Sequence, residues 1–193
     1  KLLKEIQKKK KTGLPDSMKQ AISWFLCATA VLRVRGHKKS VSMLVHTSSI
    51  QKEHFVIYDE IRNWLSDKSK VIDYCCEVYT KEAHTITKAD LQEANPDYGL
   101  LSSVREDMPT FEELLGELNV LLSGITNILL GEDKSFEYTS GLHLCVDNCS
   151  ANREAEEGTY LRIVYPTDEQ LESMEKAPAF LVIGGNTLSR GLT

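Results

Sequence analysis

The order of apolar segments along the chain is the feature that most restricts its fold. Short apolar runs at residues 41–47, 142–146, 160–165 and 179–183 alternate with longer stretches in which apolar residues recur every three or four positions. Short, nearly continuous apolar runs are typical of parallel strands buried on both faces, and the longer stretches are typical of the helices that cover them. The sequence therefore predicts an α/β fold with a mainly parallel sheet flanked by helices.

The helical stretches are unevenly distributed between these strands. Residues 68–134 have mostly helical spacing, and Thr110 begins a capping-box pattern within them. We interpret residues 68–134 as a helical insertion in a single domain that spans residues 1–193. The expected helices lie at residues 18–32, 50–65, 71–79, 88–93, 110–130 and 168–176.

Length and composition narrow the class of protein. The 193 residues are 41% apolar, enough to bury one core, and the chain begins at Lys1 rather than at Met, so we expect a fragment of a longer polypeptide. The longest apolar run, residues 21–32, is too short to span a bilayer. Five cysteines without scaffold spacing indicate reduced thiols and a cytoplasmic location.

The charge distribution limits how the chain could contact nucleic acid. Its net charge is −5, although six of the first eleven residues are lysines. A free-standing duplex-binding domain would be more basic, because phosphate neutralisation supplies most non-specific affinity. Any contact with nucleic acid must therefore be local. The lysine run itself is open to two interpretations, a phosphate-binding segment or the solvated end of a helix or linker.

The carboxyl end combines an apolar strand with a glycine-rich loop. Residues 179–183 run directly into Gly184-Gly185, and small polar residues follow as far as Thr193. Such a loop presents backbone N–H groups and hydroxyls at the carboxyl edge of a sheet, where ligands of open α/β folds bind. Spacing alone predicts either a binding loop or an ordinary strand-to-helix turn.

The same segment, Val-Ile-Gly-Gly-Asn-Thr-Leu-Ser-Arg-Gly-Leu-Thr at residues 182–193, resembles the signature of the Z1 (Z-one) domain. This family occurs beside superfamily-two helicase modules in putative bacterial endonucleases of the restriction type. The helix with Ala-Ile-Ser-Trp-Phe-Leu at residues 21–26 and the strand at residues 42–47 agree with it in order. The resemblance implies a RecA-like second lobe of the P-loop NTPase type, part of a nucleic-acid-linked, helicase-like ATPase.

The resemblance also implies roles for individual residues. The strand end at His46, Thr47 and Ser48 is similar to helicase motif four, which would place these residues near the nucleic-acid backbone. Arg190 lies in a segment similar to motif five and would be the catalytic candidate at the cleft between two lobes. Thr193 stands where many helicases have an acidic residue for the ribose, which puts direct ribose recognition in question. The implied cofactor-binding positions are Gly185, Asn186, Ser189, Gly191 and Thr193.

The chain lacks one motif that an ATPase needs. No Gly-x-x-x-x-Gly-Lys-Ser/Thr phosphate loop occurs, so ATP and magnesium would be held mainly by a missing RecA-like lobe. Residues 56–60 resemble the acidic strand of a motor ATPase, but their spacing through Trp64 is helical. We therefore expect this chain alone to be inactive and to hold no metal or cofactor. Its expected partners are nucleic acid, DNA in the first place, and the other lobe, with no membrane.

Two other functions remain open from the sequence. A true endonuclease would use a triplet such as Glu132-Asp133-Lys134, yet this triplet follows a long helix and is expected in a turn. A non-catalytic interaction module of a defence complex would use the helical stretch at 68–134. A zinc site at His143, Cys145 and Cys149 is disfavoured, because the first two share one face of a strand without a second ligand pair.

Overall fold

A three-stranded parallel sheet forms the centre of the molecule. The computed structural model describes residues 13–46, 50–83, 85, 88–94, 96, 108–148, 150–151 and 157–185. Strands β1 (Val41–His46), β6 (Ala179–Gly184) and β4 (Leu142–Asp147) lie in that order, and both pairings are parallel. The α/β fold is therefore confirmed, as are the strands predicted at 41–47, 142–146 and 179–183; Thr47 lies outside the described residues.

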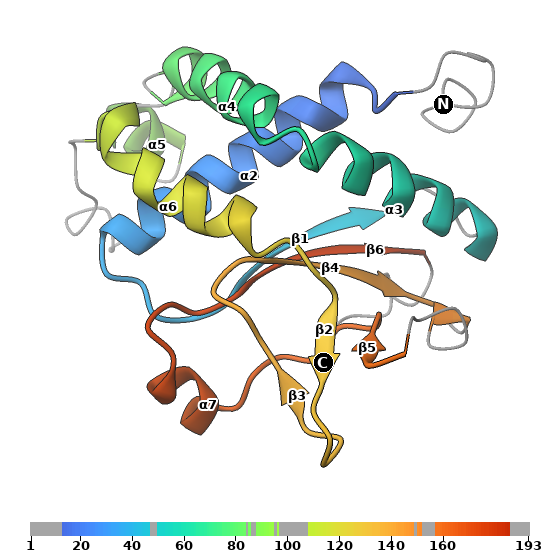
Figure 1. Ribbon diagram of the computed structural model, residues 1–193. Helices are drawn as coiled ribbons and strands as arrows, with labels where there is room; N and C mark the ends of the chain where they lie inside the picture. Colours follow the sequence, from blue (N-terminus) through green and yellow to red (C-terminus); the bar gives the residue numbers. More distant parts are fainter. Residues whose placement is uncertain are drawn as a thin grey trace.

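Helices cover one face of this sheet, as Figure 1 shows. Helix α2 lies among α3, α4 and α6, and all four contribute buried side chains to one apolar cluster with the upper face of the strands. The helices of the predicted insertion thus share the main core of the chain. The helices are α2 (Asp16–Val34), α3 (Gln51–Leu65), α4 (Lys68–Glu82), α5 (Lys88–Ala94), α6 (Phe111–Ser123) and α7 (Asp168–Ser173).

The opposite face of the parallel sheet is covered by a second, antiparallel sheet. Its strands are β3 (Phe136–Glu137), β2 (Ile128–Leu130) and β5 (Thr159–Tyr160), in that order. Between the two sheets lies a smaller apolar cluster of Ile128, Cys145, Phe180 and Val182. Because all six residues of β4 and all six of β6 are buried, these two strands are covered on both faces.

The strand predicted at 160–165 is wrong. The strand here is only Thr159–Tyr160, which pairs antiparallel to β2 in the second sheet; the Leu161 carbonyl then accepts a single bond from the Val146 N–H of β4 at 2.8 Å. The apolar residues after Leu161 are not part of a strand. Ile163 and Val164 pack against the smaller cluster, and the Tyr165 hydroxyl lies 2.9 Å from Ser42 Oγ. These residues are apolar because they cover the lower face of the parallel sheet, and they are not strands of that sheet.

The helix predicted at 110–130 ends early. Its start is confirmed, since Thr110 and Glu113 form a capping box, but α6 stops at Ser123 and β2 takes residues 128–130. A Cβ added at Gly141 would lie 2.6 Å from the Gly124 Cα atom, so the two backbones approach too closely for side chains. This contact turns the chain out of the helix, and the helical stretch predicted at 68–134 ends there.

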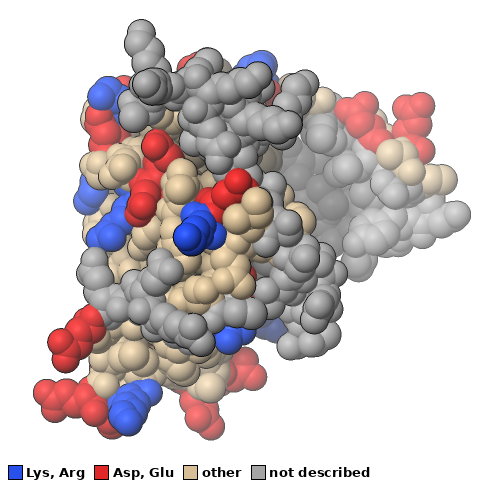
Figure 2. Space-filling model, turned by 90° about the vertical axis from the view of Figure 1, so that its right-hand side faces the viewer, with Lys and Arg blue, Asp and Glu red and all other residues tan. Residues whose placement is uncertain are grey.

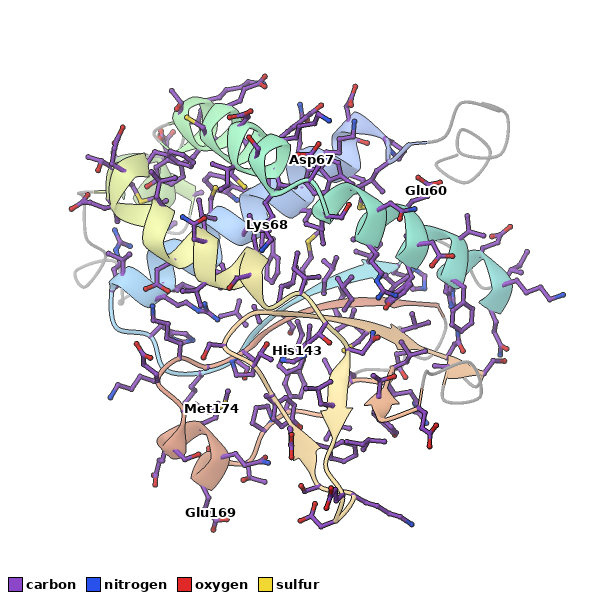
Figure 3. The ribbon with its side chains drawn as sticks, in the orientation of Figure 1. Glu60, Asp67, Lys68, His143, Glu169 and Met174 are labelled. Carbon is purple, nitrogen blue, oxygen red and sulfur yellow. The ribbon has the colours of Figure 1, made fainter. Side chains whose placement is uncertain are left out.

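His143 occupies the space between the two sheets (Figure 3). The Thr139 N–H donates to His143 Nε2 at 3.1 Å, so Nδ1 carries the proton and donates to the Asn127 carbonyl at 3.1 Å. The ring is fully buried and stacks on Phe180, with 5.5 Å between centroids. Burial lowers the pKa of His143 below its usual value, because the charged ring would lose its hydration.

This burial predicts a loss of stability in mild acid. The unfolded chain takes up a proton near pH 6.5 and the folded chain only at lower pH, so the free energy of unfolding falls as pH drops below about 6.5. The slope due to His143 is at most about 1.4 kcal/mol per pH unit, and it vanishes above that range. Denaturant unfolding from pH 8 to pH 5 measures it. The variant His143→Gln should lose this part of the slope; an unchanged slope would contradict the prediction.

Candidate functional site

The three parallel strands end level with one another. Gly184 of β6 is in register with His46 of β1 on one side and with Asp147 of β4 on the other. The parallel register thus brings His46 beside the glycine pair, and Gly185 follows as a buried residue. This carboxyl edge is where open α/β folds bind ligands, and we take it as the candidate site.

Most of the residues predicted for this site cannot be placed. The structure places His46, whose side chain is exposed, and Gly185. The other predicted positions lie outside the described residues: Thr47, Ser48, Asn186, Ser189, Arg190, Gly191 and Thr193.

An acidic and a basic side chain meet at the end of β4. Asp147 Oδ1 lies 3.2 Å from Arg162 Nε; the Asp147 side chain is 5% exposed and the Arg162 side chain 45%. A buried carboxylate needs a partner, and Arg162 supplies it. The arrangement holds the guanidinium at the rim of the carboxyl edge with its outer face toward solvent. A group held in this way can contact a phosphate oxygen.

A second polar pair joins helix α3 to the same strand end. The His54 and Asn148 side chains are both buried, and Asn148 Nδ2 lies 3.2 Å from His54 Nδ1. Asn148 Oδ1 also accepts from the Ser150 N–H at 2.8 Å, and Ser150 Oγ donates to Gln51 Oε1 at 2.6 Å. These contacts fix the first turn of α3 against the end of β4, beside the candidate site.

Asp147, Asn148, His54 and Arg162 are not among the residues predicted for the site. Asp147 and Asn148 follow the apolar run 142–146 as the glycine pair follows 179–183, so the same carboxyl-edge rule could have identified them. His54 lies four residues before Tyr58 on the buried stripe of α3, which is a weaker signal. No sequence pattern indicates Arg162 as a site residue, because residues 160–165 are predicted as a buried strand.

The face toward which the three strands run is seen in Figure 2. Lysine and arginine side chains are interspersed there with aspartate and glutamate, and uncharged residues lie between them. The visible described surface therefore has no broad basic patch.

The residues considered for other chemistry have ordinary structural roles. Residues 56–60 lie within α3, as predicted from their helical spacing. Glu132 to Lys134 form the predicted turn between β2 and β3, where Asp133 Oδ1 accepts from the Ser135 N–H at 2.9 Å. Hydrogen bonds from Ser135 lower the pKa of Asp133. Among the described residues, no three histidine, cysteine or acidic side chains are grouped so that they could hold a metal.

The described cysteines are free thiols that differ in burial. Cys27, Cys75 and Cys145 are buried free thiols, while Cys76 is exposed. Burial, reinforced by Asp147, raises the pKa of Cys145 and keeps it protonated. Within the described ranges, no helix has the length and apolar content that crossing a membrane requires.

The chain is an α/β domain in which the parallel strands place a glycine pair and a buried aspartate at one edge of the sheet, the candidate site. The family model of the Z1 domain matches residues 17–193, and the chain belongs to this family. No curated protein and no solved structure matches the chain.

Proposed function

We propose that this Z1 domain is the second, RecA-like lobe of a nucleic-acid-linked ATPase of the helicase type. One observation carries the proposal: β1 and β6, the strands that lead into the segments similar to motifs four and five, are parallel neighbours that end in register. The two segments therefore start from one edge, as a shared cleft requires. The proposal also includes the association of the family with helicases and endonucleases, and a cytoplasmic location.

In this proposal the chain supplies residues that face the cleft between the two lobes, and the other lobe supplies the loop that binds the ATP phosphates. ATP and magnesium would be held mainly by the other lobe, because the 193 residues contain no phosphate loop. Catalysis of phosphoryl transfer depends on positioning and charge, so a cleft arginine from this lobe could act on the transition state. The Arg162 guanidinium, held by Asp147, would face a phosphate at the same edge.

The chain alone is expected to be inactive. Without a phosphate loop it should hydrolyse no ATP in the presence of magnesium, with or without DNA, and it should leave plasmid DNA intact. Phosphate release and gel analysis measure both reactions. DNA cleavage by the wild-type chain that disappears in Glu132→Ala or Lys134→Ala would replace this proposal with the endonuclease alternative.

His46 provides a direct test of the nucleic-acid contact. In the protein that carries both lobes, His46→Ala should weaken single-stranded nucleic-acid binding by up to about tenfold, the loss of roughly one hydrogen bond to a charged group. Because the side chain is exposed, stability should change by less than about 0.5 kcal/mol. Fluorescence anisotropy measures the affinity.

The matched control for this test is His37→Ala. His37 is also an exposed histidine, but it lies in the loop before β1, at the opposite edge of the sheet. It should leave nucleic-acid affinity unchanged. Equal affinity of the His46→Ala variant and the wild type would remove His46 from the proposed contact.

A further inference from the structure

The carboxyl ends of the three parallel strands place one row of residues on the lower face of the sheet. His46, Gly184 and Asp147 are in register across β1, β6 and β4. The residue before each of them belongs to the apolar cluster on the upper face; these three residues are Val45, Ile183 and Val146. Because successive residues of a strand point to opposite faces, the His46 and Asp147 side chains both point to the lower face.

The spacing of this row suits an extended ligand. Neighbouring strands lie about 4.8 Å apart, so the backbones at His46 and Asp147 are separated by roughly 10 Å. Gly184 lies between them and contributes no side chain. Arg162 extends the row beyond Asp147, since its Nε lies 3.2 Å from Asp147 Oδ1. The row therefore has an exposed histidine at one end and an exposed arginine at the other.

Arg162 is held so that the two terminal amino groups of its guanidinium stay available. The Asp147 side chain is 5% exposed, so the surrounding protein fixes its position. Arg162 donates to this carboxylate through Nε, and among the described residues neither Nη1 nor Nη2 has a hydrogen-bond partner. The Arg162 side chain is 45% exposed, so solvent reaches it. The two Nη groups lie in one plane and can donate parallel hydrogen bonds to two oxygens of a phosphate.

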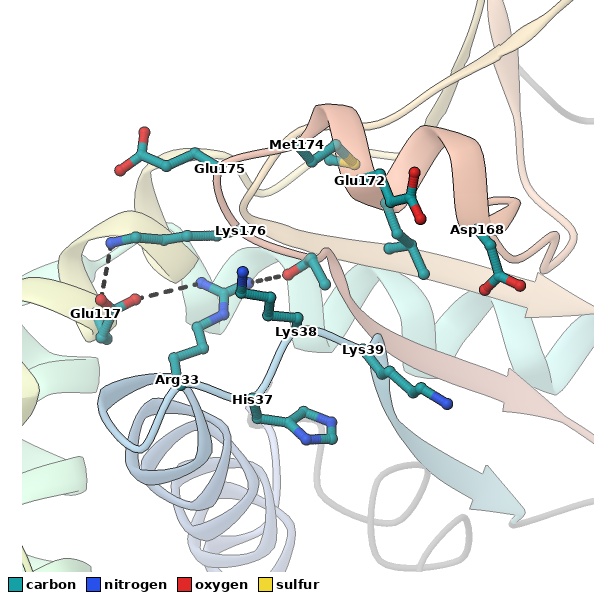
Figure 4. A pocket seen from close by; sticks show the side chains of 13 residues that line it. Arg33, His37, Lys38, Lys39, Glu117, Asp168, Glu172, Met174, Glu175 and Lys176 are labelled. Carbon is teal, nitrogen blue, oxygen red and sulfur yellow. Dashed lines mark hydrogen bonds and ion pairs between the residues drawn. The ribbon is translucent and has the colours of Figure 1, made fainter.

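An arginine at the opposite edge of the sheet shows the contrast. Arg33 points to Glu117, with 3.8 Å between Nη1 and Oε2 (Figure 4). Its Nη2 donates to the carbonyls of Ser140, at 2.8 Å, and of Ala177, at 2.6 Å. The Arg33 side chain is 6% exposed, so the protein itself surrounds its guanidinium and the ion pair is structural. Arg162 also has an acidic partner, but its Nη groups remain open to a ligand.

We infer that Arg162 binds a backbone phosphate of single-stranded nucleic acid and that Asp147 positions the guanidinium for this contact. The choice of nucleic acid rests on the proposed function, in which His46 contacts the same backbone. A nucleic-acid strand carries a phosphate at every nucleotide, so one strand can contact both ends of the row. The phosphates of ATP share the chemistry that Arg162 recognises. The contact needs no magnesium, because the guanidinium carries its own positive charge.

Fluorescence anisotropy of the full chain with a labelled oligothymidylate, at low salt and without magnesium, tests this contact. The double variant Asp147→Asn with Arg162→Gln leaves the net charge at −5 and keeps two side chains that can hydrogen-bond to each other. It should bind about tenfold more weakly than the wild type, because hydrogen bonds to a charged group are lost. The slope of log affinity against log salt concentration should become shallower by about 0.7, the contribution of one phosphate contact.

The matched control is Asp67→Asn with Lys70→Gln, which neutralises an exposed ion pair of α4 and also leaves the net charge unchanged. It should bind with the affinity and the salt dependence of the wild type. Wild-type affinity and slope in the Asp147→Asn, Arg162→Gln variant would overturn the inference, as would the absence of saturable binding by the wild type. So would a loss of labelled ATP binding in that variant with oligothymidylate binding intact, which would assign Arg162 to a nucleotide.

A second measurement separates this inference from the proposed function. Nucleic-acid-stimulated ATP hydrolysis in the protein that carries both lobes, together with normal oligothymidylate binding by the Asp147→Asn, Arg162→Gln variant, would remove only the role of Arg162. Absence of stimulated hydrolysis in the two-lobe protein would instead overturn the ATPase proposal, whatever the chain alone binds.

Discussion

Replacement of Phe180 by alanine is expected to lower the free energy of unfolding by about 3–5 kcal/mol, the cost of emptying a well-packed aromatic site. Phe180 is fully buried near the start of β6, which is the central strand of the parallel sheet. Its ring contacts the rings of Tyr138, His143 and Tyr165, with centroids 5.3–6.2 Å apart. It therefore links the parallel sheet to the layer beneath it.

The matched control is Val56→Ala on α3. Val56 is 45% exposed, so its truncation should change stability by less than about 0.5 kcal/mol. Urea unfolding followed by circular dichroism measures both variants, and the slope with denaturant checks that each unfolds in one step. A loss below about 1 kcal/mol for Phe180→Ala would mean that the lower layer does not pack on β6 as described.

How far the sequence predicted this fold depends on what each apolar run contacts. Strands β4 and β6 are buried on both faces, so their nearly continuous apolar runs predicted them within one residue. Ile163 and Val164 are also apolar, but they cover a sheet as part of a loop, and apolar character alone does not distinguish a loop from a strand. The end of α6 was missed for a related reason, since the helical spacing continues past Gly124 while the contact with Gly141 is visible only in three dimensions.

The candidate site could be predicted in position but not in composition. The predicted parallel sheet places the end of β1 beside the end of β6, and the general rule that ligands bind at such ends makes this edge the candidate site. The Asp147–Arg162 pair joins β4 to a residue beyond β5, and that pairing depends on how the second sheet folds under the first. The ion pair between Arg33 and Glu117 likewise joins residues that are far apart in sequence and follow no motif.

Replacement of Arg190 by alanine is expected to reduce nucleic-acid-stimulated ATP hydrolysis by about 10³-fold or more in the protein that carries both lobes. This is the effect of removing an arginine that stabilises the charge of the transition state in phosphoryl transfer. Arg190 itself lies outside the described residues, and the expectation comes from its place in the chain, six positions beyond the end of β6 in the segment similar to motif five. Steady-state phosphate release at saturating nucleic acid measures the effect.

The same variant separates a functional arginine from a structural one. If Arg190 acts at the cleft, Arg190→Ala should leave the melting temperature of the chain nearly unchanged, because substitutions outside the core change stability by less than about 0.5 kcal/mol. Arg190→Lys should also lose most activity, since an ammonium lacks the planar pair of donors. Arg62→Ala, at an exposed arginine of α3, should retain both activity and stability. A large loss of stability in Arg190→Ala with ATP hydrolysis intact would make Arg190 structural, and the cleft assignment of the glycine-rich loop would fail.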